Sequence, residues 1–433
     1  MSKILRLKEA LNNDLVVTYG RIKKVAGITI KSTGPKNVKI GDVCKIQTES
    51  GWVDSEVVGF DEDGVILMPL GVLDGIRFQS LVRSESKGLE VPVGRKLLGR
   101  VINALGKPID KKGPIPIDGF YPVYPKPVSP LKREIIRDAL PAGVKAIDGL
   151  LTLGKGQRIG IFAGSGVGKS TLMGMIARNS SADVNVIALI GERGREVREF
   201  IEKDLKETGL KRSVVVVATS DEAPLLRREG AFVAASIADY FRDLGMDVMF
   251  MMDSVTRFAM AQREIGLAVG EPPTTKGYTP SVFSLLPRLM ERAGNFYNGT
   301  ITAIYTVLVD GDDLMEPIAD ASRSILDGHI VLSRKIAERG RYPAIDVLKS
   351  ISRLMASVAD EKHKQLAQRI RKVLSVYTDA EDLINIGAYV KGSNKDIDEA
   401  LKYIDRIERF LAQEVDESFT LQETLKLMES IFN

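Results

Sequence analysis

The first ninety residues alternate short apolar runs with turn-forming segments. Five runs rich in β-branched residues follow one another closely, and segments such as GPKN and DEDG separate them. Brief strands at this spacing are typical of a small antiparallel barrel or sandwich. The runs are residues 15–22, 27–33, 41–48, 52–60 and 64–70. Ahead of them, Ile4, Leu7 and Leu11 have the i, i+3, i+7 spacing that predicts a short amphipathic helix.

A second pattern occupies residues 145 to about 350, where apolar runs alternate with longer stretches of helical character. Near-continuous apolar strands that alternate with helices predict a parallel sheet covered on both faces, an α/β fold. The predicted strands are residues 158–163, 184–190, 213–219, 247–253 and 300–309. Between the two regions, residues 90–145 are rich in Pro and Gly, and we expect them to form a structured connection.

After about residue 355 the strand pattern stops. Residues 354–377 and 395–415 carry heptad-like apolar spacing, which predicts a C-terminal helical bundle. The patterns therefore divide the chain into three expected domains. These are an N-terminal helix with a small β-barrel over 1–90, an α/β domain with its Pro/Gly-rich lead-in over 91–355, and a helical domain over 356–433.

The scarcity of cysteine and histidine narrows the chemistry that the chain can perform. Cys44 is the single cysteine among 433 residues, and His329 and His363 are the two histidines. An internal disulfide and a structural zinc site of Cys and His ligands are therefore excluded. With two histidines, the chain has few residues from which a Cys–His or Ser–His catalytic triad could be built. Catalysis must rest on Lys, Arg, Asp, Glu and backbone amides.

The charges nearly balance, with 61 basic and 57 acidic residues, and a net charge of +4 is weak support for a polyanionic partner. The first 45 residues are basic and could face anionic lipid or an acidic partner, although a solvated barrel surface is favoured. No apolar run approaches the roughly 20 residues of a membrane span, and charges interrupt any signal-peptide pattern near the start. We expect a cytoplasmic protein whose membrane contact, if any, is peripheral.

The strongest chemical signal is the segment AGSGVGKS at 163–170. It matches the phosphate-loop pattern G-x-x-x-x-G-K-[ST] except at the first position, which is Ala163, and a predicted strand and helix flank it as the motif requires. Its glycines let backbone N–H groups point at a phosphate, and the following helix N-terminus adds positive partial charge. The segment predicts a nucleotide site of Gly164, Ser165, Gly166, Val167, Gly168, Lys169, Ser170 and Thr171, with Lys169 on the β- and γ-phosphates and Ser170 as a Mg²⁺ ligand.

Two carboxylates at strand ends extend this site. Asp253 ends the apolar run 247–253, where it would hold the Mg²⁺ hydration shell, and Ser254 after it also allows a helix cap. Glu192 follows the run 184–190, at the strand end where ligand-contacting loops of parallel sheets occur. A carboxylate there suits the polarisation of water in line with a γ-phosphate, although a solvated loop charge is an equal alternative on spacing alone.

A phosphate loop, a GER strand end and an aspartate-terminated strand, in this order, resemble the catalytic subunits of rotary ATPases. Residues 343–352, PAIDVLKSIS, match a signature of the same superfamily, and the three-domain layout fits over essentially the whole chain. The resemblance implies an N-terminal β-barrel, a RecA-like parallel-sheet ATPase core and a C-terminal helical bundle. It also implies that Glu192 activates water, that Arg193 lies toward the γ-phosphate, that Tyr342 stacks on adenine and that Arg353 acts in the neighbouring subunit's site.

Within that superfamily, FAGSGVGKSTL and residues 270–294 resemble the flagellar protein-export ATPases most closely. This implies an ATP- and Mg²⁺-dependent hydrolase that works as a homohexamer in flagellar export. The nearest alternative is an injectisome type III secretion ATPase. Alternatives of other classes are a RecA-like hexameric nucleic-acid motor and a non-catalytic ring subunit. The loop 270–280 offers only Lys276 and Tyr278 to a nucleic acid, so we expect no nucleic-acid partner.

The resemblance further implies a set of protein partners. It places a peripheral-stalk-like regulator at the amphipathic N-terminus and a central-stalk protein near the C-terminal helices. It also implies contacts with an export gate and with chaperone–substrate complexes, at the inner face of the cytoplasmic membrane. The loop 270–280 would face the central pore of the ring.

Overall fold

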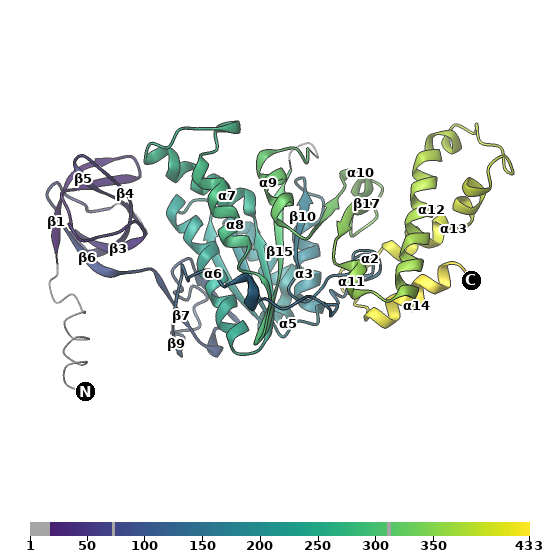
Figure 1. The fold of residues 1–433 in the computed structure, drawn as a ribbon, viewed down its shortest axis with the longest axis horizontal. Helices are drawn as coiled ribbons and strands as arrows, with labels where there is room; N and C mark the ends of the chain where they lie inside the picture. Colours follow the sequence, from purple (N-terminus) through teal and green to yellow (C-terminus); the bar gives the residue numbers. More distant parts are fainter. Residues whose placement is uncertain (1–17, 72–73, 310–312) are drawn as a thin grey trace.

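The computed structural model describes residues 18–71, 74–309 and 313–433 (Figure 1). One end of the molecule is a closed antiparallel barrel with the strand order β1-β2-β5-β4-β3-β6. Inward-facing side chains such as Ile22, Ile46 and Leu67 are fully buried, which confirms the barrel. The strands are β1 (Tyr19–Ala26), β2 (Thr29–Ser32), β3 (Asp42–Thr48), β4 (Gly51–Asp61), β5 (Gly64–Pro69) and β6 (Leu81–Gly88). The predicted helix with Ile4, Leu7 and Leu11 lies outside the described residues.

Strand β6 closes the barrel between β1 and β3, and the apolar pattern did not predict it. Val82 and Ser84 of this strand are buried, whereas Arg83 and Glu85 alternate with them and form an ion pair of 3.1 Å. Such a strand has only a weak apolar run. Its position is therefore set by its neighbours in the barrel.

The central domain is built on a largely parallel sheet with the order β17-β16-β10-β15-β13-β11-β12-β8, to which β14 adds beside β15. The five predicted strands are present, and β8, β14, β16 and β17 were not predicted. The strands are β8 (Arg100–Asn103), β10 (Arg158–Ala163), β11 (Val184–Glu192), β12 (Ser213–Thr219), β13 (Asp247–Asp253), β14 (Gly294–Phe296), β15 (Gly299–Leu308), β16 (Gly328–Leu332) and β17 (Ile345–Ser352).

Helices cover both faces of this sheet, as the apolar strands required. In β11, Ile187 and Leu189 face one hydrophobic cluster, whereas Val186, Ala188 and Ile190 face the other. The first face is covered by α2 (Lys145–Leu150), α3 (Lys169–Asn179) and parts of the C-terminal helices. The second is covered by α6 (Pro224–Asp243), α7 (Val255–Ala268) and α8 (Pro280–Met290).

Shorter elements complete the central domain. The Pro-rich connection contains β7 (Glu90–Val93) and β9 (Gly119–Pro122), which pair with each other, and two short 3₁₀ turns, η1 (Arg95–Leu97) and η2 (Pro130–Lys132). The others are α4 (Gly194–Glu199), the π-helical η3 (Phe200–Leu205), α5 (Lys206–Lys211), η4 (Thr275–Gly277), α9 (Pro317–Ile325) and α10 (Arg334–Glu338).

The chain ends in helices, as predicted, at the right of Figure 1. They are α11 (Met355–Val358), α12 (Glu361–Asn385), α13 (Lys395–Leu411) and α14 (Leu421–Ile431). Side chains of Asp360, Asn394 and Thr420 cap the last three helices at their N-termini. Over the described part of the chain, no helix is both long and apolar enough to span a membrane.

Candidate functional site

The candidate site lies where the parallel strands end. β10 leads into the phosphate loop, β11 ends at Glu192 and β13 ends at Asp253. β15 lies between β10 and β13 and contributes Thr306. Because the carboxyl ends of parallel strands meet at one edge of a sheet, segments that are far apart in the sequence converge here.

The phosphate loop has the backbone shape that its glycines predict. Gly166 and Gly168 have φ angles of 78° and 90°, in the left-handed region that residues with a Cβ rarely adopt. Val167 is buried and anchors the loop. Ala163 is the last residue of β10 and fully buried, so the first position of the motif is extended strand here and needs no glycine.

Lys169 is held between two carboxylates. Its Nζ lies 2.5 Å from Oδ1 of Asp253 and 3.9 Å from Oε1 of Glu192. The same Asp253 oxygen accepts a hydrogen bond of 2.7 Å from the Thr306 hydroxyl. Burial disfavours the charge of Lys169, but the attraction of Asp253 and Glu192 outweighs it, so the pKa of the ammonium is raised. The lysine is therefore charged at neutral pH.

Glu192, unlike Lys169 and Asp253, has a buried side-chain polar atom without a hydrogen bond. Its Oε1 is buried and has no hydrogen-bond partner. Burial, followed by repulsion from Asp253, raises the pKa of Glu192 to about 7, against the attraction of Lys169. A carboxyl group that titrates near neutrality, with a free acceptor beside a phosphate loop, has the properties of a general base.

The structure brings Arg257 into this group, a residue that the sequence patterns did not predict. Arg257 lies in the first turn of α7, four residues after Asp253, and its aliphatic part packs on Gly191. Its Nε is buried without a partner, and its charge lowers the pKa of Glu192. An arginine one helical turn after a strand-ending aspartate was the available signal. Thr306 had none, because it lies within an apolar strand.

The Tyr342 ring lies at the edge of the site, beside the phosphate loop. A Cβ placed on Gly168 would lie 3.5 Å from the Tyr342 ring, and the ring is 46% exposed. The C-terminal segment closes the same edge, since the N–H of Gln413 donates to the Tyr342 carbonyl at 2.9 Å. A half-exposed aromatic ring at this place leaves one face for a flat ligand group.

Arg193 does not join the group in the described structure. Its side chain is 74% exposed and pairs with Glu196 at 3.2 Å.

Arg353 lies at the opposite edge of the sheet from the phosphate loop. β16 runs parallel to β10 and β17 antiparallel, so Ile345 is beside the loop edge and Ser352 at the far edge. The backbone N–H of Arg353 donates to Asp327, whose carboxylate binds the start of β10. With β10 six residues long and a rise of about 3.3 Å per residue, Arg353 lies on the order of 17 Å from its own phosphate loop.

The oxygen atoms at the site fit Mg²⁺. The Ser170 hydroxyl in the first turn of α3 and the Asp253 carboxylate are hard oxygen donors of the kind that Mg²⁺ prefers. No group of three or more His, Cys, Asp or Glu side chains among the described residues is arranged to hold a metal unaided. The site therefore suits a cation that arrives with phosphate oxygens and takes few protein ligands.

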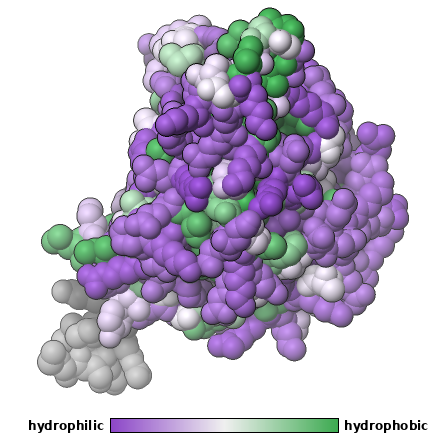
Figure 2. All heavy atoms as spheres, turned by 90° about the vertical axis from the view of Figure 1, so that its right-hand side faces the viewer, coloured by the Kyte–Doolittle hydropathy of each residue, from purple (hydrophilic) through white to green (hydrophobic). Residues whose placement is uncertain are grey.

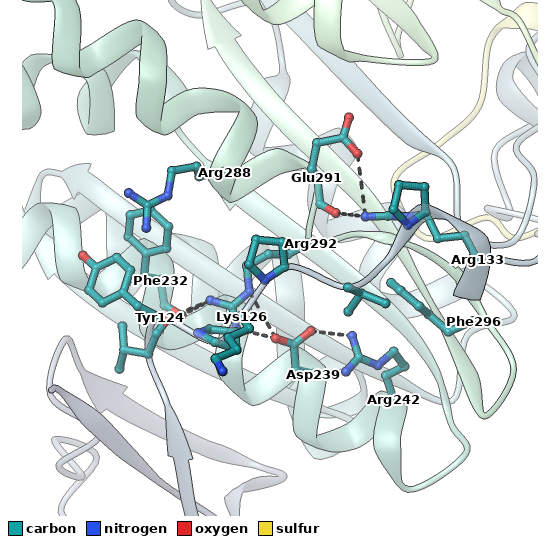
Figure 3. Close-up of a pocket in the computed structure, with 15 residues that line it drawn as sticks. Tyr124, Lys126, Arg133, Phe232, Asp239, Arg242, Arg288, Glu291, Arg292 and Phe296 are labelled. Carbon is teal, nitrogen blue, oxygen red and sulfur yellow. Dashed lines mark hydrogen bonds and ion pairs between the residues drawn. The ribbon is translucent and has the colours of Figure 1, made fainter. Parts of the chain in front are cut away.

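A separate cavity of about 270 Å³ lies between residues 123–133 and helices α6 and α8 (Figure 3). Its lining is basic, with five Lys and Arg side chains against Asp239 and Glu291, and Asp239 binds both Arg242 and Arg292. Arg288 lies over the Tyr124 ring at 6.0 Å. The cavity shares no lining residue with the phosphate-loop site, which remains the candidate for chemistry.

Comparisons with known proteins match the central and the C-terminal parts of the chain. The nucleotide-binding domain of the ATP synthase alpha/beta family matches residues 143–352, and the T3SS EscN ATPase C-terminal domain matches residues 359–430. The chain is 57% identical to the flagellum-specific ATP synthase of Bacillus subtilis, over 95% of each chain. It is 50% identical to the type 3 secretion system ATPase of Xanthomonas euvesicatoria, over 95% of this chain and 94% of that protein.

Solved structures share the fold. The assembled ATPase EscN of enteropathogenic E. coli superposes with a TM-score of 0.90 at 44% identity, covering 96% of this chain and all of EscN. EscN in complex with its central stalk EscO superposes with a TM-score of 0.88 over the same shares.

Proposed function

The chain belongs to the family of flagellum-specific ATP synthases and type III secretion system ATPases, and on this premise we propose that it hydrolyses ATP to serve flagellar protein export. The observation that carries the proposal is the pair of carboxylates around Lys169 beside a phosphate loop. A triphosphate entering the loop competes for Lys169 and releases Asp253 and Glu192. The same exchange therefore binds the nucleotide and frees both carboxylates.

Each freed carboxylate has a role in hydrolysis. Ser170 and Asp253 would hold Mg²⁺, which supplies neutralisation of phosphate charge when it is bound. Glu192 accepts a hydrogen bond from a water placed in line with the γ-phosphate, through the oxygen that is now unpartnered. As the water oxygen bonds to the γ-phosphorus, the bond to the β–γ bridging oxygen breaks and ADP leaves. The water proton is taken up at Glu192 and passes on to solvent or product.

Two further side chains complete the proposed site within the subunit. Tyr342 stacks on the adenine with the ring face that its position leaves open. Arg193 turns from Glu196 toward the γ-phosphate when nucleotide is bound. The weak hold of an exposed ion pair permits this turn.

We infer that a second copy of the chain supplies Arg353. An arginine about 17 Å from its own phosphate loop cannot serve that loop, but its exposed position suits a neighbour's site. Exposed apolar side chains lie on the segments around it, with Ile135 72% and Ile351 47% exposed. Ile136, next to Ile135, and Leu354, next to Arg353, both pack about Gly154. A ring of six copies would cover this surface and complete each site at a boundary.

The burial of one residue argues against the alternative function, a RecA-like nucleic-acid motor. Tyr278, the aromatic residue of the loop 270–280, is 3% exposed, and Arg263 lies over its ring at 5.3 Å. It is therefore not available for stacking on bases. The injectisome ATPase remains the nearest alternative, and the higher identity to a flagellar relative favours the flagellar system.

The C-terminal end offers a surface for a central stalk. Figure 2 views this end of the molecule, and apolar atoms gather at the top of a largely hydrophilic face, the level at which Figure 1 places the α12–α13 turn. The exposed apolar residues of that turn are Leu383, Ile386 and Val390. We propose that a stalk protein binds there, as EscO is described with EscN. A regulator at the N-terminus, an export gate, chaperone–substrate complexes and contact with the inner membrane face remain part of the proposal.

The test is phosphate release by the purified chain as a function of protein concentration, with the mass measured at each point. Specific activity that rises with the hexamer fraction supports the proposal. An equally active monomer contradicts the shared site, and no hydrolysis in confirmed rings with Mg²⁺ contradicts the enzymatic function.

A further inference from the structure

A buried group of charges joins the barrel to the central domain. Glu56 of β4 is 4% exposed, and Arg228 and Glu229 of α6 are 7% and 0% exposed. Arg228 lies between the two carboxylates, with Nη2 2.5 Å from Oε1 of Glu56 and 2.6 Å from Oε1 of Glu229. The hydroxyl of Tyr124 also donates to Glu229 at 2.6 Å. One guanidinium therefore faces two carboxylates, which leaves one excess negative charge in the interior.

This charge is not balanced by the other groups of the cavity that the cluster lines. A cavity of about 690 Å³ between the barrel and the central domain is lined by Glu56, Tyr124 and Arg228. The other ionisable groups on its walls are three cations and three anions, namely Lys39, Asp42, Lys87, Glu90, Glu271 and Arg288. Their formal charges cancel. A buried carboxylate without a counter-charge is strongly disfavoured, so the cluster must gain a positive charge from elsewhere.

The cluster also lacks a hydrogen-bond donor. The Oε2 atoms of Glu56 and Glu229 are both buried without a hydrogen-bond partner, and so is Oε1 of Gln262, which lines the same cavity. These are three acceptors without a donor. A single proton on one carboxyl group removes the excess charge and converts one acceptor into a donor.

We propose that Glu56 and Glu229 form a proton-binding site, and that the barrel docks on the central domain with one proton held between them. The apolar part of the same junction consists of Met68 and Leu70 from the barrel side with Leu225 and Ile265 from α6 and α7. That contact is insensitive to pH. The carboxyl pair adds a second contact that depends on the proton.

The direction of the pH dependence follows from Glu56. Burial, with repulsion from Glu229 and against the attraction of Arg228, raises the pKa of Glu56 from 4.5 to about 7. Between these values the docked state binds more protons than the undocked state. Raising the pH from about 5 to about 7 therefore favours undocking, and above about 7 the dependence levels off. The tyrosine and arginine in contact do not titrate there, because the pKa values of Tyr124 and Arg228 are raised well above their usual range.

Trp52 allows a direct test, because it is the single tryptophan of the chain and lies in β4 of the barrel. Urea unfolding of the full chain would be followed by Trp52 fluorescence from pH 5 to 8. We expect the unfolding equilibrium constant of the wild type to rise with pH, because Glu56, Glu192 and Asp148 all have pKa values raised to about 7. Glu56→Gln should lower this slope by up to about tenfold per pH unit, the share of one proton, and leave the rest. Glu90→Gln, an exposed carboxylate on the same cavity, should keep the wild-type slope.

Infrared spectroscopy at pH 6 provides a second readout. A protonated carboxyl band that is weaker in Glu56→Gln or Glu229→Gln than in the wild type supports the site. The proposal is overturned if Glu56→Gln keeps the wild-type slope or if the wild-type spectrum has no such band. It is also overturned if sodium or potassium at fixed pH stabilises the barrel while the pH slope is absent, because a metal cation would then supply the missing charge.

Discussion

Nζ of Lys169 lies 2.5 Å from Oδ1 of Asp253, so the lysine of the phosphate loop is bound by the carboxylate that ends β13. The ammonium and the carboxylate neutralise each other until phosphates and Mg²⁺ enter. Thr306 fixes the same oxygen from the neighbouring strand. The two residues are thereby placed for a ligand that separates them, and substitution of either leaves a buried charge unpaired.

Replacement of Lys169 tests the phosphate loop itself. Lys169→Ala removes a charge-assisted contact to the phosphates, so we expect ATP affinity to fall about 10- to 100-fold. Equilibrium binding of a fluorescent nucleotide measures this loss. Lys155→Ala is the matched control, because Lys155 forms an ion pair of the same length with Asp247 at the start of β13. Unchanged affinity in Lys169→Ala would count against the loop assignment.

The titration of Glu192 predicts a pH profile for hydrolysis. The carboxylate form is the base, and the pKa of Glu192 is raised to about 7 by burial and by Asp253. We therefore expect kcat/KM to rise with pH up to about 7 and then to level off, since this ratio reports the free enzyme.

Glu192→Gln separates this base from the rest of the site. It should bind ATP like the wild type and lose about 10²- to 10⁴-fold in kcat, with the rise near pH 7 absent from the residual rate. Steady-state phosphate release across pH 5.5–9 measures both effects. A Gln variant with the wild-type profile would assign the titration to another group.

Replacement of Tyr342 tests how much stacking on the adenine contributes to nucleotide affinity. Its ring is 46% exposed beside Gly168, so its removal should cost little folding stability. Tyr342→Ala should weaken nucleotide binding by about 1–3 kcal/mol, whereas Tyr342→Phe keeps the stacking face and the affinity. Calorimetric titration of the two variants with an ATP analogue compares them. Equal losses in both would indicate that the hydroxyl, not the ring face, contacts the nucleotide.

Exposed apolar residues on the segment before Ile136, which packs about Gly154 together with Leu354, predict an assembly defect. Leu131 is 97% and Ile135 72% exposed, so charged substitutions there should leave the single chain folded. Leu131→Asp with Ile135→Asp should shift the protein from hexamer to smaller species in light scattering, with an unchanged thermal midpoint of the monomer. Val390→Asp, at a similarly exposed site on the α12–α13 turn, is the control that should still form rings. Intact rings in the double variant would place the interface elsewhere.

The sequence predicted the elements whose pattern is local. β10, β12 and β13 begin and end at the predicted residues, because a strand buried on both faces is a continuous apolar run. β6 and β17 were missed since polar side chains alternate along them. Their strand character depends on pairing with neighbours, which the local pattern does not contain.

The site was predictable to the extent that its residues lie in motifs. Lys169, Asp253 and Glu192 meet as expected, because each follows a strand of one parallel sheet. The place of Arg353 required the register of β16 with β17, and the contact between Glu56 and Arg228 joins residues 172 positions apart. Such contacts are set by tertiary packing and leave no periodic signal.

We propose that each active site is completed by Arg353 from the next subunit. Lys169→Ala lacks a working phosphate loop and Arg353→Ala lacks the donated arginine, so each variant alone should hydrolyse at least about 10³-fold more slowly than the wild type. In rings mixed from the two variants, about one boundary in four combines an intact loop with an intact Arg353. Phosphate release by mixed rings of confirmed mass is the decisive measurement. Hydrolysis should return on mixing, whereas mixed rings as inactive as either parent would contradict the shared site.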